Sequence, residues 1–178
     1  QVDKLQAVAR EHESAEQALK ESGERYRSVF ENTGTATIII EDDMTISMVN
    51  AKFEALTGYS KKEIQGRMKW TEFVVEEDVE RMKSYHVKRR KDSRSAPTEY
   101  ECRVINRFGE VKDMYVRIDM IAGTRSSVGS FMDITAFKQT EDAFKLFGFG
   151  KAADVALKRI GYPGAKQSDK RDSLMRKP

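Results

Sequence analysis

The sequence has few of the residues that build catalytic or metal sites. Its 178 residues include a single cysteine, Cys102, and two histidines, His12 and His86, which lie in separate segments. One cysteine excludes a disulfide within the chain and favours a reducing compartment. No His or Cys pair has metal-site spacing, and there is no nucleophile elbow or glycine-rich phosphate loop. We therefore expect no catalytic residues, no metal site and no enzymatic activity.

Long hydrophobic runs are also missing. No stretch approaches the roughly 18 uncharged apolar residues of a transmembrane helix, and none has the pattern of a signal peptide. Charged residues make up 34% of the chain, yet the formal net charge is only +3. These features predict a cytoplasmic protein without direct membrane insertion. Because the chain begins at Gln1, we expect a segment of a longer parent, which could carry a membrane anchor.

Positive charge is concentrated at the C-terminal end. Residues 145–178 hold nine Lys and Arg against three Asp, which gives +6 there and leaves −3 for residues 1–144. Glycine, proline and basic residues predict that the tail over 148–178 is largely disordered. The tail has no ladder of aromatic residues, so we expect no specific nucleic-acid binding. A nucleic-acid-binding regulator that uses this tail is a lesser alternative.

Apolar residues near the N-terminus recur at alternating spacings of three and four. This heptad pattern runs for nearly four repeats and predicts a coiled coil that forms a homodimer. An amphipathic helix that lies on its own domain is the other interpretation. Gly23 lowers helix stability by about 1 kcal/mol and predicts a joint that ends a linker helix over 1–23. The predicted dimer seam consists of Leu5, Val8, Ala15, Leu19 and Tyr26.

The next segments predict a hairpin and a broken connection. Two β-rich runs, 35–40 and 45–49, flank an acidic turn and predict a β-hairpin. Residues 50–66 then predict two very short helices joined at Gly58, because Ser60 and Glu63 have capping-box spacing. A segment this broken is typical of a connection that folds over the face of a sheet.

The second half of the sequence predicts one helix, three strands and an exit helix. Acidic residues 76–78 start a helix that ends near 91–92, and its basic run 88–91 is predicted to be a solvated helix end. Alternating apolar residues predict strands over 97–106, 111–121 and 128–134. Residues 135–147 return to helical spacing. The simplest arrangement of these elements is an α+β fold, with helices on one face of an antiparallel sheet.

Several blocks of sequence, which cover about residues 24–144, together resemble a PAS domain, with the domain itself expected over 24–134. The blocks are ERYRSVFEN at 24–32, NAKFEALTGYSKKEIQG at 50–66, RVINRFGE at 103–110 and GSFMDITAFK at 129–138, with Phe73 and the pair 77–78 between them. The resemblance implies a five-stranded antiparallel sheet of order 2-1-5-4-3, flanked by N- and C-terminal signalling helices. It also implies a sensory module of prokaryotic signalling proteins such as histidine kinases and diguanylate cyclases. The effector domain would then lie elsewhere in a longer parent.

The resemblance brings two cofactors into consideration, flavin and haem, and the residues of this chain argue against both. Flavin-thiol relatives carry a reactive cysteine just after the glycine that corresponds to Gly66, where this chain has Arg67, and a glutamine where it has Phe131. Haem-binding relatives take an axial histidine from the helix that corresponds to 78–91. His86 lies on that helix, but the relatives' histidine aligns nearer residues 82–83. We expect no cofactor, and a haem sensor that uses His86 is a lesser alternative.

A small organic ligand could occupy the apolar interior. Most of the residues concerned must pack the core whatever the function, because a domain of this size has little apolar material to spare. A ligand-sensing module and a ligand-free, constitutive interaction domain therefore both stay open. Thr37 and Arg67 are further polar groups on offer. The candidate pocket residues are Ile38, Ile40, Phe53, Leu56, Ile64, Trp70, Phe73, Met82, Tyr85, His86, Cys102, Met114, Val116, Gly129 and Phe131.

The sequence Asp133-Ile134-Thr135 lies where the last strand becomes the exit helix. Asp133 or Thr135 can cap that helix. The resemblance implies a further role as a signal relay, in which Asp133 ties the sheet to the exit helix through Arg27 or another base. We hypothesise that Asp133→Ala uncouples input from output while leaving the fold intact.

Overall fold

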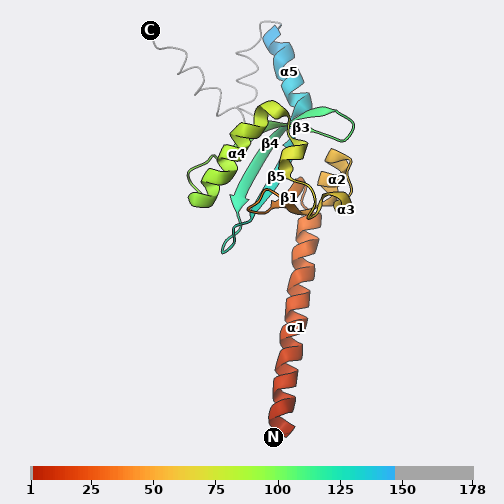
Figure 1. Ribbon diagram of the computed structural model, residues 1–178. Helices are drawn as coiled ribbons and strands as arrows, with labels where there is room; N and C mark the ends of the chain where they lie inside the picture. The colour runs from red at the N-terminus through yellow and green to blue at the C-terminus, as the bar shows by residue number, and fades with distance from the viewer. Residues whose placement is uncertain (1, 147–178) are drawn as a thin grey trace.

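The computed structural model describes residues 2–146, with five strands and six helical segments (Figure 1). The α+β prediction is confirmed, and the predicted tail over 148–178 lies outside the described residues. The elements in chain order are α1 (Val2–Glu31), β1 (Ala36–Ile40), β2 (Ile46–Val49), α2 (Ala51–Thr57), α3 (Lys61–Ile64), the 3-10 helix η1 (Trp70–Phe73), α4 (Glu76–Lys91), β3 (Glu99–Ile105), β4 (Val111–Met120), β5 (Ser127–Asp133) and α5 (Thr135–Leu146).

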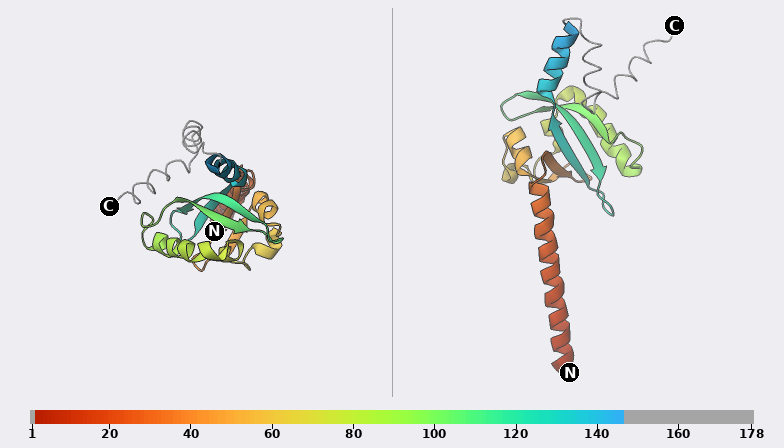
Figure 2. Two further views of the ribbon diagram at one scale, coloured as in Figure 1. Left: turned by 90° about the horizontal axis from the view of Figure 1, so that it is seen from above. Right: turned by 180° about the vertical axis from the view of Figure 1, so that it is seen from behind.

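The strands form one antiparallel sheet of order β2-β1-β5-β4-β3, as the resemblance implied. At its centre β1 pairs with β5, so that Ile38 lies opposite Gly129. A Cβ atom at Gly129 would lie only 2.8 Å from Cδ1 of Ile118, so the sheet packs closely here. The helices between β2 and β3 cover one face of the sheet (Figures 1 and 2).

The core fills the space between the sheet and these helices. Phe53 of α2 is fully buried, and its ring lies 5.5 Å from that of Phe73 in η1 and 5.7 Å from that of Phe131 in β5. Ile64 of α3 is also fully buried, and Leu56 packs against the same cluster. Three elements that lie far apart in sequence therefore meet at Phe53.

The predicted connection over 50–66 has the expected caps. Asn50 begins α2 by accepting a hydrogen bond from the Phe53 N–H, and Gly58 ends it with φ at 77°. The Glu63 carboxylate accepts hydrogen bonds from the backbone N–H and the hydroxyl of Ser60, as the capping-box spacing predicts. No sequence pattern predicted η1, because a single 3-10 turn is too short to show a period.

Gly58→Ala is expected to destabilise the protein by about 1–2 kcal/mol, because Gly58 combines a positive φ with close packing. An added Cβ would lie 3.0 Å from both Arg107 and the Phe108 ring. Gly66 has φ at 70° and nothing within 4 Å, so Gly66→Ala isolates the backbone strain. Urea unfolding measures both variants against Gly34→Ala, which is free of both effects. Equal stability of the Gly58 and Gly34 variants would contradict this account.

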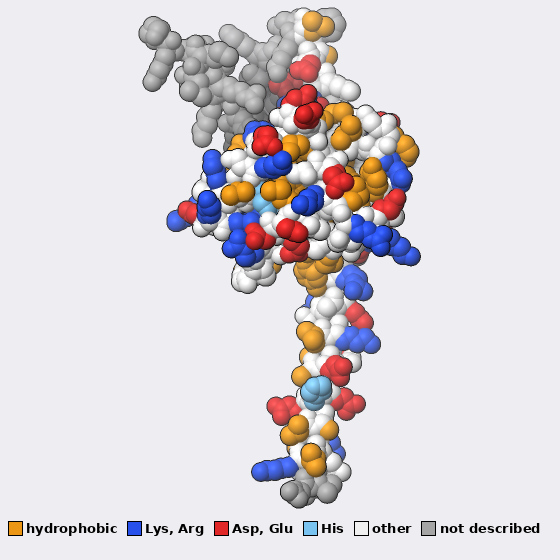
Figure 3. Space-filling model, viewed as in Figure 1, with side chains coloured by type: hydrophobic (Ala, Val, Ile, Leu, Met, Phe, Trp, Pro, Cys, Tyr) orange, Lys and Arg blue, Asp and Glu red, His pale blue; other side chains and the backbone are white. Residues whose placement is uncertain are grey.

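Helix α1 runs without a break through Gly23, so the predicted joint there is wrong. One glycine lowers the stability of a helix but does not end it when good helix formers surround it. The interpretation in which the helix lies on its own domain is also wrong. Residues 4–29 are all exposed, and Phe30 is the first buried side chain. The helix projects from the domain as a rod that carries exposed hydrophobic side chains along its length (Figures 1 and 3).

The basic run at the end of α4 is not a solvated helix end. Lys88 and Lys91 are exposed, but Arg89 is only 3% exposed and the side chain of Arg90 only 4%. Arg89 follows Met82 and His86 at helical spacing, so it lies on the buried face. Sequence analysis missed this spacing because all four residues of the run are charged.

Candidate functional site

A small cavity lies between the sheet and the helices that cover it. Its volume is about 30 Å³, which is room for one or two water molecules. Its lining comes from β1, α2, η1, α4 and the strands β3, β4 and β5, and it includes Trp70 of η1. The core is therefore almost filled in this state.

The structure places some of the candidate pocket residues at this cavity. Those that line it are Ile38, Ile40, Phe53, Trp70, Phe73, Met82, His86 and Phe131. The others, which do not line it, are Leu56, Ile64, Tyr85, Cys102, Met114, Val116 and Gly129, together with Thr37 and the exposed Arg67. Sequence analysis missed six lining residues, which are Val74, Arg89, Tyr100, Val104, Ile118 and Ser127.

Two of the candidates belong to a different surface. Tyr85 and Cys102 line an open groove of about 530 Å³ beside α4 and β3, together with Asp78 and Arg81. The Cys102 thiol is buried, and burial raises its pKa to about 12. A thiol that stays protonated at neutral pH is a poor nucleophile. Its position and protonation therefore do not fit flavin-thiol chemistry.

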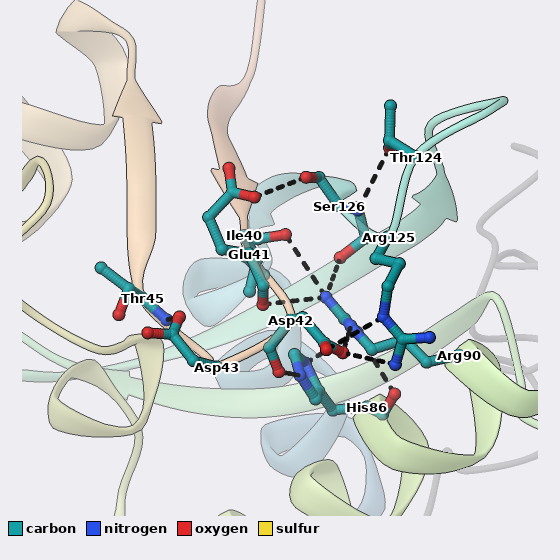
Figure 4. A network of polar contacts seen from close by, with 11 residues as sticks. Ile40, Glu41, Asp42, Asp43, Thr45, His86, Arg90, Thr124, Arg125 and Ser126 are labelled. Atoms are coloured by element: carbon teal, nitrogen blue, oxygen red, sulfur yellow. Dashed lines mark hydrogen bonds and ion pairs between the residues drawn. The ribbon is translucent and has the colours of Figure 1, made fainter.

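His86 is held in one tautomer by two partners (Figure 4). An arginine side chain can only donate, so Nη1 of Arg90 donates to Nδ1 of His86 at 2.9 Å. Nε2 therefore carries the proton and donates to the Asp42 carbonyl oxygen at 3.0 Å. Desolvation lowers the pKa of His86, against the opposing effect of the Asp42 hydrogen bond, so the ring is neutral.

A haem does not fit the residues at this site. Both ring nitrogens of His86 already have protein partners, so neither is free to ligate iron. The cavity that His86 lines is also far smaller than a porphyrin. Within residues 2–146, no cluster of three or more His, Cys, Asp or Glu side chains could hold a metal ion.

Arg90 clamps the end of α4 to two loops of the sheet (Figure 4). Its Nη2 donates to the carbonyl oxygens of Ile40 and Glu41 at 3.3 and 3.0 Å, and to the hydroxyl of Ser127 at 3.4 Å. Its Nε lies 3.3 Å from a carboxylate oxygen of Asp42, an ion pair without hydrogen-bond geometry. Arg125 holds the same carboxylate with bonds of 2.9 and 3.0 Å. The charge of Arg90 is therefore neutralised inside the fold.

Arg89 has a different environment. Its Nη2 donates to the Pro97 carbonyl, but its Nε has no hydrogen-bond partner, and no carboxylate of the described residues lies within 4.0 Å. Desolvation lowers the pKa of Arg89, which still remains a cation because arginine does not deprotonate in proteins. Trp70, which is 5% exposed, also has no partner for its Nε1–H within the described part of the chain.

The junction between β5 and α5 is bonded to β4. Asp133 accepts a hydrogen bond from the Thr135 N–H at 3.0 Å, and the Thr135 hydroxyl accepts one from the Asp113 N–H at 3.0 Å. The base that pairs with Asp133 is Lys112, at 3.2 Å, and not Arg27. Desolvation acts to raise the pKa of Asp133, but hydrogen bonds from Thr135 and Lys112 outweigh it and lower the pKa. Ile134 between them is buried.

Comparison with known proteins agrees with this fold. A family model described as the PAS fold matches residues 46–132. The PAS domain of an HTR-like protein from Haloarcula marismortui is 24% identical with a TM-score of 0.54, and the match covers 68% of this chain and 99% of that one. A domain of a sensory box sensor histidine kinase/response regulator from Geobacter sulfurreducens is 17% identical with a TM-score of 0.55, with coverages of 65% and 96%.

A third solved structure carries a ligand. The quorum-sensing receptor PAS domain of Cronobacter turicensis, in complex with C12:0, is 18% identical with a TM-score of 0.51. That match covers 58% of this chain and 97% of the other. A search of curated proteins found no match. At these identities the solved structures establish the fold alone.

None of the helices within residues 2–146 is both long and apolar enough to cross a membrane.

The sheet order, the helices over one face and the family match agree with one another. Residues 46–132 therefore match the PAS family model, and the described domain has the PAS fold.

Proposed function

We propose that this chain is a PAS sensory module that dimerises through α1 and relays changes in the domain through its terminal helices. The observation that carries the proposal is the unpartnered seam on α1. Leu5, Val8, Leu19 and Tyr26 are 71%, 63%, 75% and 50% exposed. Their heptad spacing places them on one stripe of a 30-residue helix, which is roughly 45 Å long at 1.5 Å per residue.

A helix of this kind favours a partner. Most helical stability in proteins comes from packing of an apolar face, and α1 has no such packing on its own domain. A second copy of the same helix offers a matching stripe, because knobs-into-holes packing is symmetric in a parallel dimer. The seam therefore favours a homodimer over an isolated helix.

The terminal helices are joined firmly to the sheet, which a relay requires. At one end, the side-chain amide of Asn50 donates to the carbonyl oxygen of Phe30, near the C-terminal end of α1. At the other end, α5 is tied to β4 through Asp133 and Thr135. Helices α1 and α5 leave the domain at opposite ends (Figures 1 and 2). A shift between the sheet and its covering helices would thus change the register or crossing of paired helices, a two-state element that a ligand or partner biases.

The alternative is a constitutive interaction domain without a ligand. The cavity of about 30 Å³ favours it, because so small a space holds no sizeable molecule without rearrangement. Thermal unfolding in the presence of metabolites distinguishes the two functions. A ligand that binds the native state must raise the melting temperature, whereas a ligand-free domain shows no such rise with any metabolite. The effector domain, a kinase or cyclase in a longer parent, belongs to the same proposal.

Charge placed on the seam should dissociate the dimer. We expect the wild type to sediment as a dimer over a concentration series, and Leu5→Glu with Leu19→Glu to raise the dissociation constant at least about 100-fold, since buried leucines are lost and like charges face each other. The control is Gln6→Glu with Ser14→Glu, which adds the same charge at exposed positions off the seam. A wild type that stays monomeric throughout would exclude dimerisation through α1 alone.

A further inference from the structure

Arg89 is a buried cation without a counter-ion among residues 2–146. It is 3% exposed, and the described residues place no carboxylate within ion-pair distance of it. Asp119 acts on it only at longer range, and that carboxylate is bonded to Arg117 at 2.8 Å. Burial raises the pKa of Tyr100, so its nearby phenol is neutral and supplies no negative charge. A charge buried in this way is unfavourable unless something pairs with it.

The adjacent residue shows what a structurally satisfied arginine looks like in this helix. The Arg90 side chain is as deeply buried, but it has the Asp42 carboxylate, two backbone carbonyls and the ring of His86 as partners. The fold can therefore neutralise a buried guanidinium here. Arg90 has the Asp42 carboxylate as a counter-ion and Arg89 has none among the described residues, although the Nε–H of each lacks a hydrogen bond.

Two of the three described residues with a buried N–H that lacks a partner line the same cavity. Arg89 and Trp70 both line it, and each leaves an N–H without a partner among the described residues. Two buried donors without acceptors indicate a missing acceptor, since buried polar groups are nearly always hydrogen-bonded. Arg89 also lines an open surface groove of about 410 Å³ with Ser93 and Thr98, so this residue borders both the cavity and the groove. This groove offers a route of entry.

We propose that the cavity binds the carboxylate of a small organic monoacid, with Arg89 as its counter-ion and Trp70 as a second donor. This proposal rests on the sensory function proposed above and names its ligand class. A single unpaired cation matches a single negative charge, because Arg90 is already neutralised by Asp42. The rest of the lining is largely apolar and suits a short hydrocarbon tail. The flexible side chain of Met82, which also lines the cavity, can yield to such a tail.

The single tryptophan allows a direct test on the full chain, because Trp70 lies in the cavity wall. We expect sodium acetate or sodium butyrate to change its emission saturably and to raise the melting temperature. Sodium chloride at equal ionic strength and 1-butanol, which lacks the charge, should do neither. Arg89→Gln should weaken acid binding at least about tenfold, since a charge-assisted hydrogen bond is lost. Lys91→Gln removes the same charge from an exposed position of the same helix and should leave binding unchanged.

A second variant, Trp70→Phe, keeps the proposal testable if Arg89→Gln does not fold. Trp70→Phe removes only the indole donor, and we expect it to weaken acid binding about threefold or more, measured by thermal unfolding. Equal responses to butyrate, 1-butanol and chloride, or full binding by both variants, would overturn the carboxylate assignment. No response to either acid would also overturn it. Sedimentation of the same samples decides dimerisation separately, so the two proposals can fail independently.

Discussion

Asn50→Ala is expected to lower the free energy of unfolding by about 3–5 kcal/mol, among the largest effects of any single substitution in this chain. Asn50 is 0% exposed, and both the carbonyl oxygen and the amide group of its side chain form hydrogen bonds. Its carbonyl oxygen accepts from the N–H groups of Thr37 and Phe53 at 2.9 and 3.0 Å. Its amide donates to Phe30, Thr33 and Thr35 at 2.9 to 3.3 Å. Alanine would remove all five of these hydrogen bonds at once.

The matched control is Asn106→Ala. The Asn106 side chain makes three hydrogen bonds, to Glu110 and from the N–H groups of Phe108 and Glu110, compared with five for Asn50, and it lies at an exposed turn. Water can replace those partners, so the expected loss is about 1 kcal/mol. Urea unfolding compares the two variants. Similar losses would mean that the Asn50 network does not hold α1, β1 and α2 together.

Arg90→Met should cost about 2–4 kcal/mol of stability. Methionine keeps roughly the length of the side chain but cannot donate, so the carbonyls of Ile40 and Glu41 and the Nδ1 of His86 each lose the hydrogen bond from Arg90. The Asp42 carboxylate keeps Arg125, which limits the loss on that side. The end of α4 would then separate more easily from the β1–β2 turn.

Arg125→Met provides the control for this prediction. Arg125 bonds the same Asp42 carboxylate, but its side chain is 69% exposed, so solvent replaces it readily. We expect no measurable change in the urea midpoint for this variant. If Arg90→Met were equally neutral, the clamp between α4 and the sheet would not contribute to folding.

The sequence was informative wherever one local rule decided the outcome. Alternation along Tyr100, Cys102 and Val104 predicted a strand with these side chains inward, and all three are buried. Gly58 and the Ser60–Glu63 pair predicted the ends of two short helices, because capping depends on neighbours in sequence.

The sequence was misleading where tertiary contacts override local character. The basic run 88–91 has the composition of a solvated helix end, and only the fold shows that Arg89 and Arg90 turn inward. Asn50 appeared as a residue at a helix start, although its partners lie up to 20 residues away. The partial cavity lining has the same origin, because the lining depends on which inward side chains face a gap and which pack closely.

Disulfide cross-linking along α1 tests the central claim, dimerisation through the seam, most directly. Single cysteines at Leu19 and Tyr26 lie on the predicted seam, and cysteines at Gln6 and Ser14 lie off it. The buried thiol of Cys102, whose pKa is raised to about 12, contributes little background. A parallel, in-register dimer predicts covalent dimers from the two seam positions and almost none from the other two. Equal cross-linking at all four positions, or none at any, would contradict the account.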